Sequence, residues 1–397
     1  MPVQQILHEI KGIKGEAYLI QMCFTYYERG LIKIVRQEKM KAAVLHGIGD
    51  MRFEAVDIPK LKPHEVLIRV KYVGICGSDL PRAMVSGLTG NTTYPLILGH
   101  EFSGQIVELG ETVKQEHVWQ MGDRVTVAPL IPCGTCEHCR SGDYGLCDQY
   151  KIIGTRMNGA MAEFVKAPAS HVLRLPDGLN YQTAAGIEPA TIAFHGIEKA
   201  EIHPGDSVSI LGAGPIGQFA IQWAKIFGAS KIFAVDIFDD KLAIAKRLGA
   251  THVINGKFTD PVAEIHQQTK IGVDAVLETA GSHFTQEEAL LMAKKHGHIA
   301  FVGISHGGLP LKASSAERIL RGELTVRGSW NSYTAPYPGR AWTATMDFMA
   351  KGDLIFEPMI SHVIHLQDVD TYLRKMAQHE ILFNKVLVQV DEMEDAI

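Results

Sequence analysis

The 397-residue chain is predicted to be an α/β protein of two domains, one with a doubly wound six-stranded sheet and one mainly of β-strands. Three observations predict this class. Apolar strands and amphipathic helices alternate between residues 206 and 328, a glycine-rich turn follows the first of those strands, and four cysteines crowd a short loop upstream. At about 100–200 residues per domain, the length suits two or three units.

The composition is typical of a soluble globular protein, because 46% of the residues are hydrophobic and 21% are charged. The formal net charge of −5 offers no basic surface for a polyanion, so nucleic acid is not expected as a partner. No apolar run reaches the about 18 residues needed to cross a bilayer, and no secretory leader opens the chain. We therefore expect no membrane partner and a cytoplasmic location.

The first domain is predicted to consist of residues 40–189 and 332–397. Residues 1–39 show no clear amphipathic period, and we expect them to be an N-terminal extension of doubtful authenticity. The pattern changes at Met40, where residues 40–45 predict a strand and the alternation in 66–73 predicts a half-buried one. Residues 332–397 read as loops, a helix near 366–378 and an apolar strand at 386–390, which is expected to rejoin the N-terminal unit.

The second domain, residues 190–331, is predicted from six strands and the helices between them. Six is the number of strands that a doubly wound dinucleotide-binding fold requires. The strands are expected at 206–211, 231–236, 251–254, 273–278, 298–302 and 323–328, and the helices at 218–227, 239–248, 260–269, 284–295 and 314–320.

A glycine motif, Gly212-Ala213-Gly214-Pro215-Ile216-Gly217, lies between the first of these strands and the first helix. Such a motif alone is a weak signal, but between strand and helix it indicates a dinucleotide site. Gly212 permits the tight turn, Gly214 lets the pyrophosphate approach the backbone, and Gly217 allows close contact of helix and strand.

An acidic residue, Asp236, ends the next strand 19 residues after Gly217. Its carboxylate would accept hydrogen bonds from the adenosine ribose hydroxyls and repel a 2′-phosphate, which favours NAD over NADP. Lys241, on the following helix, is expected beside the adenosine; the alternative is a solvated surface lysine.

Four cysteines, Cys133, Cys136, Cys139 and Cys147, have the spacing Cys-x2-Cys-x2-Cys-x7-Cys. Four thiolates on a short loop suit tetrahedral zinc and leave no position for water or substrate, so this site would be structural. A reducing compartment argues against disulfides. The alternatives are four unligated thiols or an iron–sulfur cluster, which also uses four thiolates.

Cys76, His100 and Glu101 are the candidates for a second, catalytic metal site. Cys, His and Glu are donors that zinc accepts, and three protein ligands with a vacant fourth position are typical of a catalytic zinc. Gly99 and Gly104 are expected to form the turn that lets the histidine and the glutamate reach one ion. The alternative is a buried thiol and two unrelated polar residues, because spacing does not show adjacency.

Together these motifs resemble the zinc-dependent medium-chain dehydrogenases, in the polyol branch that includes sorbitol dehydrogenase. The likeness covers about residues 40–390. The motifs behind the family resemblance are residues 76–79, residues 99–101, the four-cysteine loop and the glycine motif. A closer resemblance within the polyol branch lies in residues 76–82, 98–104, 129–133 and 324–330. The resemblance implies a GroES-like fold for the first domain, one catalytic and one structural zinc, NAD, and a homodimer or homotetramer joined through the dinucleotide domains.

The resemblance also implies the reaction. A secondary alcohol of a sugar alcohol or its phosphate would be oxidised, with galactitol 1-phosphate converted to tagatose 6-phosphate as the favoured case. The alternatives are an unphosphorylated polyol such as sorbitol, or L-threonine. An alternative of another class is a catalytically silent relative that binds the nucleotide.

Residue roles follow from the same resemblance. Cys76, His100 and Glu101 would bind the catalytic zinc, and Glu188 would bind it directly or through its water; an ordinary acid at a domain junction is the alternative. Ser78 matches the hydroxyl that relays the substrate proton. Pro81 stands where sorbitol dehydrogenases carry a histidine, so the outer end of the relay would fall to water.

A phosphorylated substrate would need a cationic anchor. Arginine suits this role because its planar fork binds phosphate through two hydrogen bonds. Arg82 and Arg156 are the candidates, and a surface ion pair or a solvated charge is the alternative for each.

Overall fold

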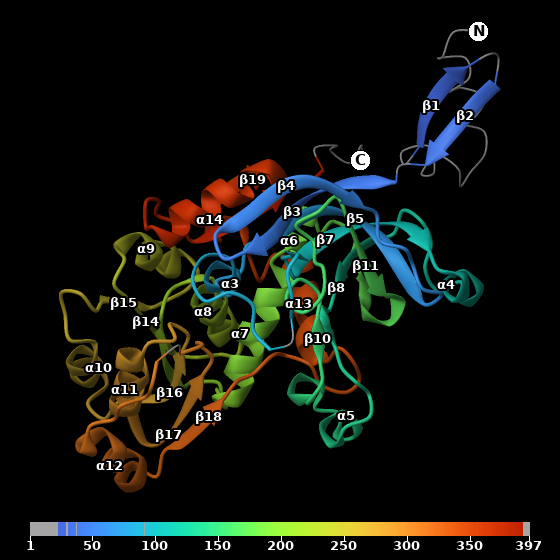
Figure 1. Cartoon of the computed structure of the whole chain (residues 1–397). Coiled ribbons are helices and arrows are strands. Elements are labelled where there is room, and N and C mark those ends of the chain that lie inside the picture. Colours follow the sequence, from blue (N-terminus) through green and yellow to red (C-terminus); the bar gives the residue numbers. More distant parts are fainter. Residues whose placement is uncertain (1–22, 29–30, 37, 91, 306, 392–397) are drawn as a thin grey trace.

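The computed structural model describes residues 23–28, 31–36, 38–90, 92–305 and 307–391, and Figure 1 shows their arrangement. Residues 1–22 of the predicted N-terminal extension lie outside the described residues. Its later part contains two strands that the sequence pattern did not predict, β1 (Cys23–Glu28) and β2 (Leu31–Arg36), which pair antiparallel with each other.

The first domain is built on a seven-stranded sheet with the order β12-β8-β7-β5-β20-β19, in which β11 also pairs with β5. Because β20 pairs antiparallel with β5, the C-terminal tail forms part of this sheet. Its strands are β5 (Glu65–Gly74), β7 (Glu101–Leu109), β8 (Arg124–Val127), β11 (Phe164–Pro168), β12 (Val172–Arg174), β19 (Ile360–His365) and β20 (Lys385–Gln389).

Two smaller sheets and several short helices complete the first domain. The smaller sheets contain β3 (Lys39–Gly47), β4 (Asp50–Asp57) and β6 (Leu96–Ile97), and β9 (Leu130–Ile131) with β10 (Lys151–Ile152). The α-helices are α3 (Asp79–Met84), α4 (Glu111–Glu116), α5 (Glu137–Ser141), α6 (Tyr181–Ala184) and α14 (Val369–Ala377). The 3₁₀ helices are η1 (Tyr144–Leu146), η2 (Ala169–His171), η3 (Glu357–Met359) and η4 (Leu366–Asp368).

The second domain is built on a six-stranded parallel sheet with the order β15-β14-β13-β16-β17-β18, which confirms the predicted doubly wound class. Its strands are β13 (Ser207–Leu211), β14 (Lys231–Asp236), β15 (His252–Asn255), β16 (Val273–Glu278), β17 (Ala293–Phe301) and β18 (Thr325–Gly328). Its helices are α8 (Pro215–Ile226), α9 (Asp239–Arg247), α10 (Pro261–Thr269), α11 (His283–Met292) and α12 (Ala313–Gly322).

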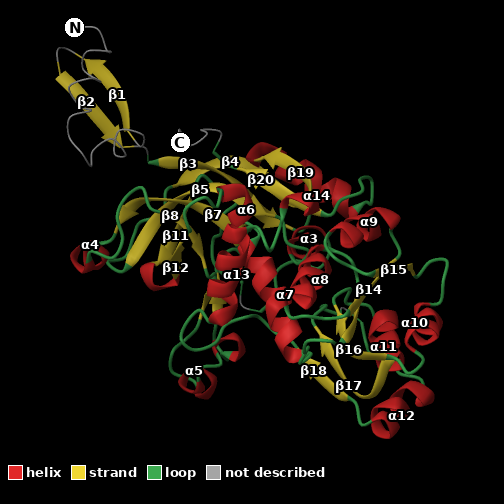
Figure 2. Cartoon of the chain, turned by 180° about the vertical axis from the view of Figure 1, so that it is seen from behind, coloured by secondary structure: helices red, strands yellow, loops and turns green. Residues whose placement is uncertain are grey.

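Alternate residues of the parallel strands point into different cores. Ile232 and Ala234 of β14 pack into a core shared with α8, whereas Phe233 and Val235 pack into a core on the other face of the sheet. Because both faces are covered, these strands read as continuous apolar runs. Figure 2 shows helices on both sides of the sheet.

Several predicted element bounds differ from the structure, and the differences between α11 and β17 are among the larger ones. Helix α11 ends at Met292, and the segment from Ala293 belongs to β17, which begins five residues before the predicted strand. The Lys294 ammonium forms an ion pair with Asp274 of β16, and this pair fixes the segment beside that strand.

A twelve-residue helix, α13 (Arg340–Lys351), was predicted as loop. Its buried residues Ala341, Trp342, Thr345, Met346 and Met349 recur at helical spacing. A glycine follows the helix as its left-handed C-cap, which is a usual stop signal.

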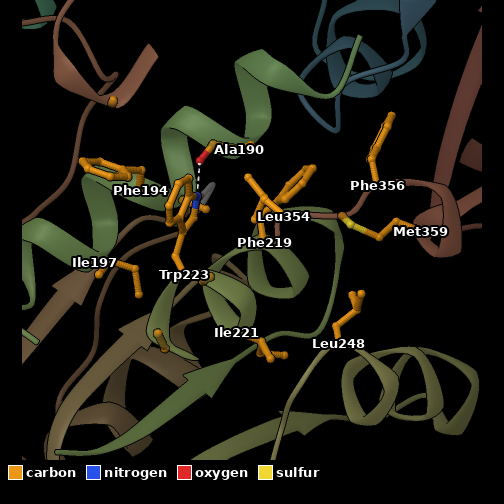
Figure 3. Close-up of a cluster of buried hydrophobic side chains, with 14 of the residues drawn as sticks. Ala190, Phe194, Ile197, Phe219, Ile221, Trp223, Leu248, Leu354, Phe356 and Met359 are labelled. Carbon is orange, nitrogen blue, oxygen red and sulfur yellow. Dashed lines mark hydrogen bonds between the residues drawn. The ribbon is translucent and has the colours of Figure 1, made fainter. Parts of the chain in front are cut away.

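The largest core joins the two domains through α7 (Ile187–Lys199), α8 and α13 (Figure 3). Trp223 of α8 is fully buried and donates from Nε1 to the carbonyl oxygen of Ala190, at 3.0 Å. The ring of Phe194 packs edge-on against it, with 4.9 Å between the ring centroids. Among the described helices, none has both the length and the apolar character to cross a membrane.

The substitution Trp223→Phe should lower the free energy of unfolding by about 1–3 kcal/mol, because it removes one hydrogen bond and leaves a void in the core. The midpoint of thermal unfolding reports this loss. Phe258→Leu serves as the matched control, since the Phe258 side chain is 74% exposed and its replacement should change little. Equal midpoints for Trp223→Phe and the wild type would contradict the packing described here.

Candidate active site

The pairing of β5 with β7 places Cys76 near Glu101. Gly74 lies directly opposite Glu101 in this register, and Cys76 follows two residues later, at the start of the turn into α3. A side chain at position 74 would collide with the Glu101 carboxylate and with the Lys385 side chain. A larger residue at position 74 would therefore displace the Glu101 carboxylate and the Lys385 side chain from these positions.

The structure brings Cys76, His100 and Glu101 together. One potential ligand atom from each lies within 4.8 Å of the other two. Gly99 has φ of +97°, a conformation that other residues rarely adopt, and so turns the chain just before His100. The expectation that Gly104 shares this turn is wrong: Gly104 lies inside β7, where a Cβ would collide with the Arg69 carbonyl of β5.

Short-range contacts hold the cysteine turn in place. The Cys76 amide donates to Oδ2 of the buried Asp79, at 3.0 Å, and the Ile75 amide donates to the Val386 carbonyl of β20. The other Asp79 oxygen, Oδ1, lies 3.9 Å from Nδ1 of His100. Asp79 therefore connects the backbone of the cysteine turn with the imidazole.

Lys385, at the start of β20, is a buried cation beside these groups. Its ammonium forms an ion pair with the Glu101 carboxylate and donates to the Ile75 carbonyl oxygen at 3.1 Å. The negative charges of Glu101 and Cys76 raise the pKa of Lys385 despite its burial. The lysine thus remains charged and offsets one of the buried acids.

The acids of the cluster exceed its cations. Burial, together with the negative charges of Glu101 and Asp79, raises the pKa of Cys76 to about 12. Burial also raises the pKa of Asp79 and raises that of Glu188 to about 8. A divalent cation would neutralise such a cluster, so the donor set and its charge fit zinc.

Glu188 lies in the first turn of α7, close enough for the charges of His100, Glu101 and Cys76 to act on its pKa. It does not belong to the group of three whose ligand atoms lie within 4.8 Å of one another. Its carbonyl oxygen accepts from the Thr191 hydroxyl, at 2.7 Å, which in turn contacts Ser332. Glu188 stays a predicted metal ligand, direct or through water.

The four cysteines of the second predicted site also converge. Ligand atoms of Cys133, Cys136, Cys139 and Cys147 lie within 4.8 Å of one another. Hydrogen bonds from the side chain and amide of Thr135 and the amide of Cys136 lower the pKa of Cys133 to about 6. Amide donors that stabilise a thiolate favour metal binding, because the thiolate is the ligand form.

The glycine motif forms the predicted turn between β13 and α8. Gly212 has φ of +92°, and a Cβ on Gly217 would collide with the Gly212 carbonyl oxygen. Gly214 is the N-cap of α8, and a Cβ placed on it would meet no atom within 4 Å. The backbone there is open to an approaching ligand, and the helix N-terminus favours an anionic one.

A cavity of about 240 Å³ connects the two predicted sites. From the first domain it is lined by Cys76, Glu101 and Lys385, and from the second by residues 214–217 and Lys241. The metal candidates and the glycine turn therefore face one space. Lys241 lies in this cavity, with its ammonium 5.0 Å from the centroid of the Phe238 ring.

Asp236 contacts the glycine turn directly. Its Oδ2 accepts from the Ala213 amide at 2.7 Å, and its Oδ1 accepts from the amides of Ile237 and Phe238. A carboxylate has about four acceptor positions, so one remains for a ribose hydroxyl.

Each of the two candidate phosphate anchors donates to an oxygen atom of a nearby residue. Arg82 donates from Nη1 to the Ser78 carbonyl at 2.8 Å and to the Ser78 hydroxyl at 2.7 Å. The exposed Arg156 donates to the Tyr150 carbonyl oxygen at 2.9 Å, and its guanidinium lies over the Tyr150 ring. The described residues that line the cavity do not include either arginine.

Sequence reasoning missed Lys385, Asp79 and Thr279. Lys385 is a charged residue at the head of an apolar strand, and this isolated charge was a readable signal. Thr279 follows β16 and donates from Oγ1 to the Leu211 and Gly212 carbonyl oxygens, which ties the end of β16 to the glycine turn. No sequence motif marked that contact.

Family models match both parts of the chain. An alcohol dehydrogenase GroES-like domain matches residues 62–177, and a zinc-binding dehydrogenase domain matches residues 215–351.

Relatives match most of the chain. Galactitol 1-phosphate 5-dehydrogenase of Escherichia coli (strain K12) is 38% identical over 325 residues, which cover 81% of this chain and 92% of that protein. Sorbitol dehydrogenase of Bacillus subtilis (strain 168) is 35% identical, with 88% and 97% covered. The crystal structure of a putative zinc-binding dehydrogenase from Sinorhizobium meliloti 1021 bound to NADP superposes with a TM-score of 0.82, at 31% identity, covering 89% of this chain and all of that one.

Metal analysis of dialysed protein should find two zinc ions per wild-type chain and negligible iron, with one zinc left in Cys76→Ala. The loss follows because a thiolate is removed from a site with only three or four protein ligands. Thermal unfolding of Cys76→Ala is the control that the chain still folds. Two zinc ions in that variant would contradict the assignment, and stoichiometric iron would favour a cluster in the four-cysteine loop.

Proposed function

The chain belongs to the zinc-dependent medium-chain alcohol and polyol dehydrogenases, and we propose that it oxidises a sugar-alcohol phosphate with NAD, converting galactitol 1-phosphate to tagatose 6-phosphate. It is an oxidoreductase that acts on CH–OH groups. The observation that carries the proposal is the shared cavity, in which Cys76 and Glu101 face the glycine turn.

Cys76, His100 and Glu101 would hold the catalytic zinc, with Glu188 beside them. When bound, zinc would lower the pKa of the substrate hydroxyl and NAD would accept the hydride. The Ser78 hydroxyl would take the substrate proton, and its distance of 3.3 Å from the Cys76 sulfur supports this role. Residues of both domains line the cavity and would keep water from the reacting carbon.

Asp236 supports NAD as the cofactor. Its carboxylate stands at the end of β14 and keeps one acceptor position for a ribose hydroxyl. A 2′-phosphate at that place would meet a negative charge. The Sinorhizobium structure was solved with NADP, so the choice between the two cofactors needs a direct test.

Asp236→Asn should lower the preference for NAD over NADP, measured as the ratio of kcat/KM values, by about tenfold or more. The amide keeps an oxygen acceptor for the Ala213 amide but removes the charge that repels the 2′-phosphate. Asp239→Asn, on the exposed first turn of α9, is the matched control. A wild-type enzyme with a higher kcat/KM for NADP than for NAD would contradict the proposal that NAD is the cofactor.

The preference for a phosphorylated substrate is supported by the similarity to galactitol 1-phosphate 5-dehydrogenase and by Arg82, which lies in α3 two residues after Leu80, a residue that lines the cavity. Nη1 of Arg82 is occupied by Ser78, which leaves Nη2 and Nε of its fork for a phosphate. Arg156 would have to release the Tyr150 carbonyl to reach the substrate. Unphosphorylated sorbitol is the second candidate, on the strength of the similarity to sorbitol dehydrogenase.

A side-by-side assay of galactitol 1-phosphate, sorbitol and L-threonine with NAD tests the substrate. We expect the highest kcat/KM for galactitol 1-phosphate. Arg156→Ala should raise its KM by about tenfold or more, through loss of a charge-assisted hydrogen bond, and leave that of sorbitol unchanged. Arg321→Ala, on the exposed end of α12, is the control.

If Arg156→Ala lowers kcat/KM equally for galactitol 1-phosphate and for sorbitol, Arg156 is not a phosphate anchor. Turnover of sorbitol or threonine alone would establish the corresponding alternative. Binding of NADH without turnover of any alcohol would instead favour the silent nucleotide-binding relative.

A further inference from the structure

Arg82 makes its closest contacts with Ser78, one helical turn before it. Nη1 donates to the Ser78 carbonyl oxygen at 2.8 Å and to Oγ of the same residue at 2.7 Å. The Ser78 hydroxyl lies 3.3 Å from the Cys76 sulfur. The guanidinium, the hydroxyl and the thiol thus form a short series of hydrogen bonds that leads from the partly buried Arg82 side chain to the metal candidates.

The donor and the acceptor of the hydrogen bond between Arg82 and Ser78 are fixed by chemistry. A guanidinium group carries only donors and keeps its protons at all ordinary pH values. Ser78 Oγ must therefore act as the acceptor toward Arg82. Its own hydrogen points to the Cys76 sulfur, and its second lone pair stays open to a ligand, next to Cys76 and Gly77, which line the cavity.

From this geometry we infer that Arg82 is a positioning residue for the reaction, which fixes the rotation of the Ser78 hydroxyl so that its free lone pair faces the substrate oxygen. The inference rests on the proposed alcohol oxidation. The substrate hydroxyl proton passes to the free lone pair of Ser78 Oγ, and the hydrogen that Ser78 directs at the Cys76 sulfur is released to solvent, which reaches the partly exposed Ser78. Arg82 exchanges no proton.

In α3 the Ser78 hydroxyl accepts from Arg82, whereas the preceding residue, Pro81, has a ring without a polar atom. Without a fixed partner the serine hydroxyl would rotate among its staggered positions. A donor that occupies one lone pair removes part of that freedom before the substrate binds, which is a form of preorganisation.

Arg82 also lies 3.9 Å from Oδ1 of Asp79, so a purely structural role through Asp79 and His100 has to be separated from a role through Ser78. A double-mutant cycle separates them, because two residues that act through one contact do not lose activity additively. The cycle compares the wild type, Arg82→Met, Ser78→Ala and the double variant. The substrate pair is one phosphorylated and one unphosphorylated polyol.

We expect Arg82→Met to lower kcat by about tenfold or more on both polyols, as for the loss of an aligned proton acceptor. In the Ser78→Ala background the same substitution should change kcat by less than about twofold, because its target is absent. Zinc content and NADH affinity should match the wild type in all variants. If Arg82→Met does not fold, Arg82→Gln replaces it in the same cycle.

Multiplying losses in the double variant would overturn the inference and assign Arg82 to Asp79. A rise in KM for the phosphorylated polyol with unchanged kcat would overturn it as well, and would leave Arg82 as a phosphate anchor alone. A wild type that oxidises no alcohol would remove the proposed function and this inference together, whereas an active wild type with multiplying losses removes only the inference.

Discussion

The pairing of β5 with β7 is the constraint on which the active site depends. It sets Gly74 opposite Glu101, and only a residue without a side chain leaves room there for the Glu101 carboxylate and the Lys385 side chain. Cys76 follows the end of β5, and Lys385 begins β20, which comes from near the C-terminus and pairs with β5 on its other side. Three segments distant in sequence thus meet at one buried point through backbone pairing alone.

The charges at this point explain why the site calls for a metal ion. Cys76, Asp79, Glu101 and Glu188 gather where burial opposes ionisation, and Lys385 is the buried cation beside them. Buried charges are costly unless they are paired. A dication would compensate the thiolate and a carboxylate, while the Lys385 ammonium forms an ion pair with the Glu101 carboxylate. The lysine is therefore a partner of the metal site rather than a competitor for its place.

Much of the architecture could be predicted from the sequence, because its signals are local. The six parallel strands read as apolar runs separated by helices, and the glycine motif stands in its required context between β13 and α8. The cysteine spacing is local in the same way. Helix α13 also has a readable period of buried residues and a glycine stop, so the local sequence does carry the signal for this helix.

The contacts that the sequence did not reveal are those made by tertiary pairing. The sequence suggested Gly104 as a turn residue, but its position opposite β5 in the sheet makes it a strand residue. Lys385 has an isolated charge in the sequence, but its contact with Glu101 arises only because β20 pairs with β5. The contact of Thr279 with the glycine turn likewise depends on the pairing of β16 with β13. Arg82 was considered as a phosphate anchor from its residue type, whereas its contact with Ser78 depends on the single turn of α3.

The most direct measurement is an anomalous difference map, collected at the zinc absorption edge from crystals of the protein grown with NADH. We expect an anomalous peak for zinc between Cys76, His100 and Glu101, about 2.3 Å from the Cys76 sulfur, with the nicotinamide in the same cavity. A peak in the four-cysteine loop alone, in protein that oxidises its alcohol, would contradict it.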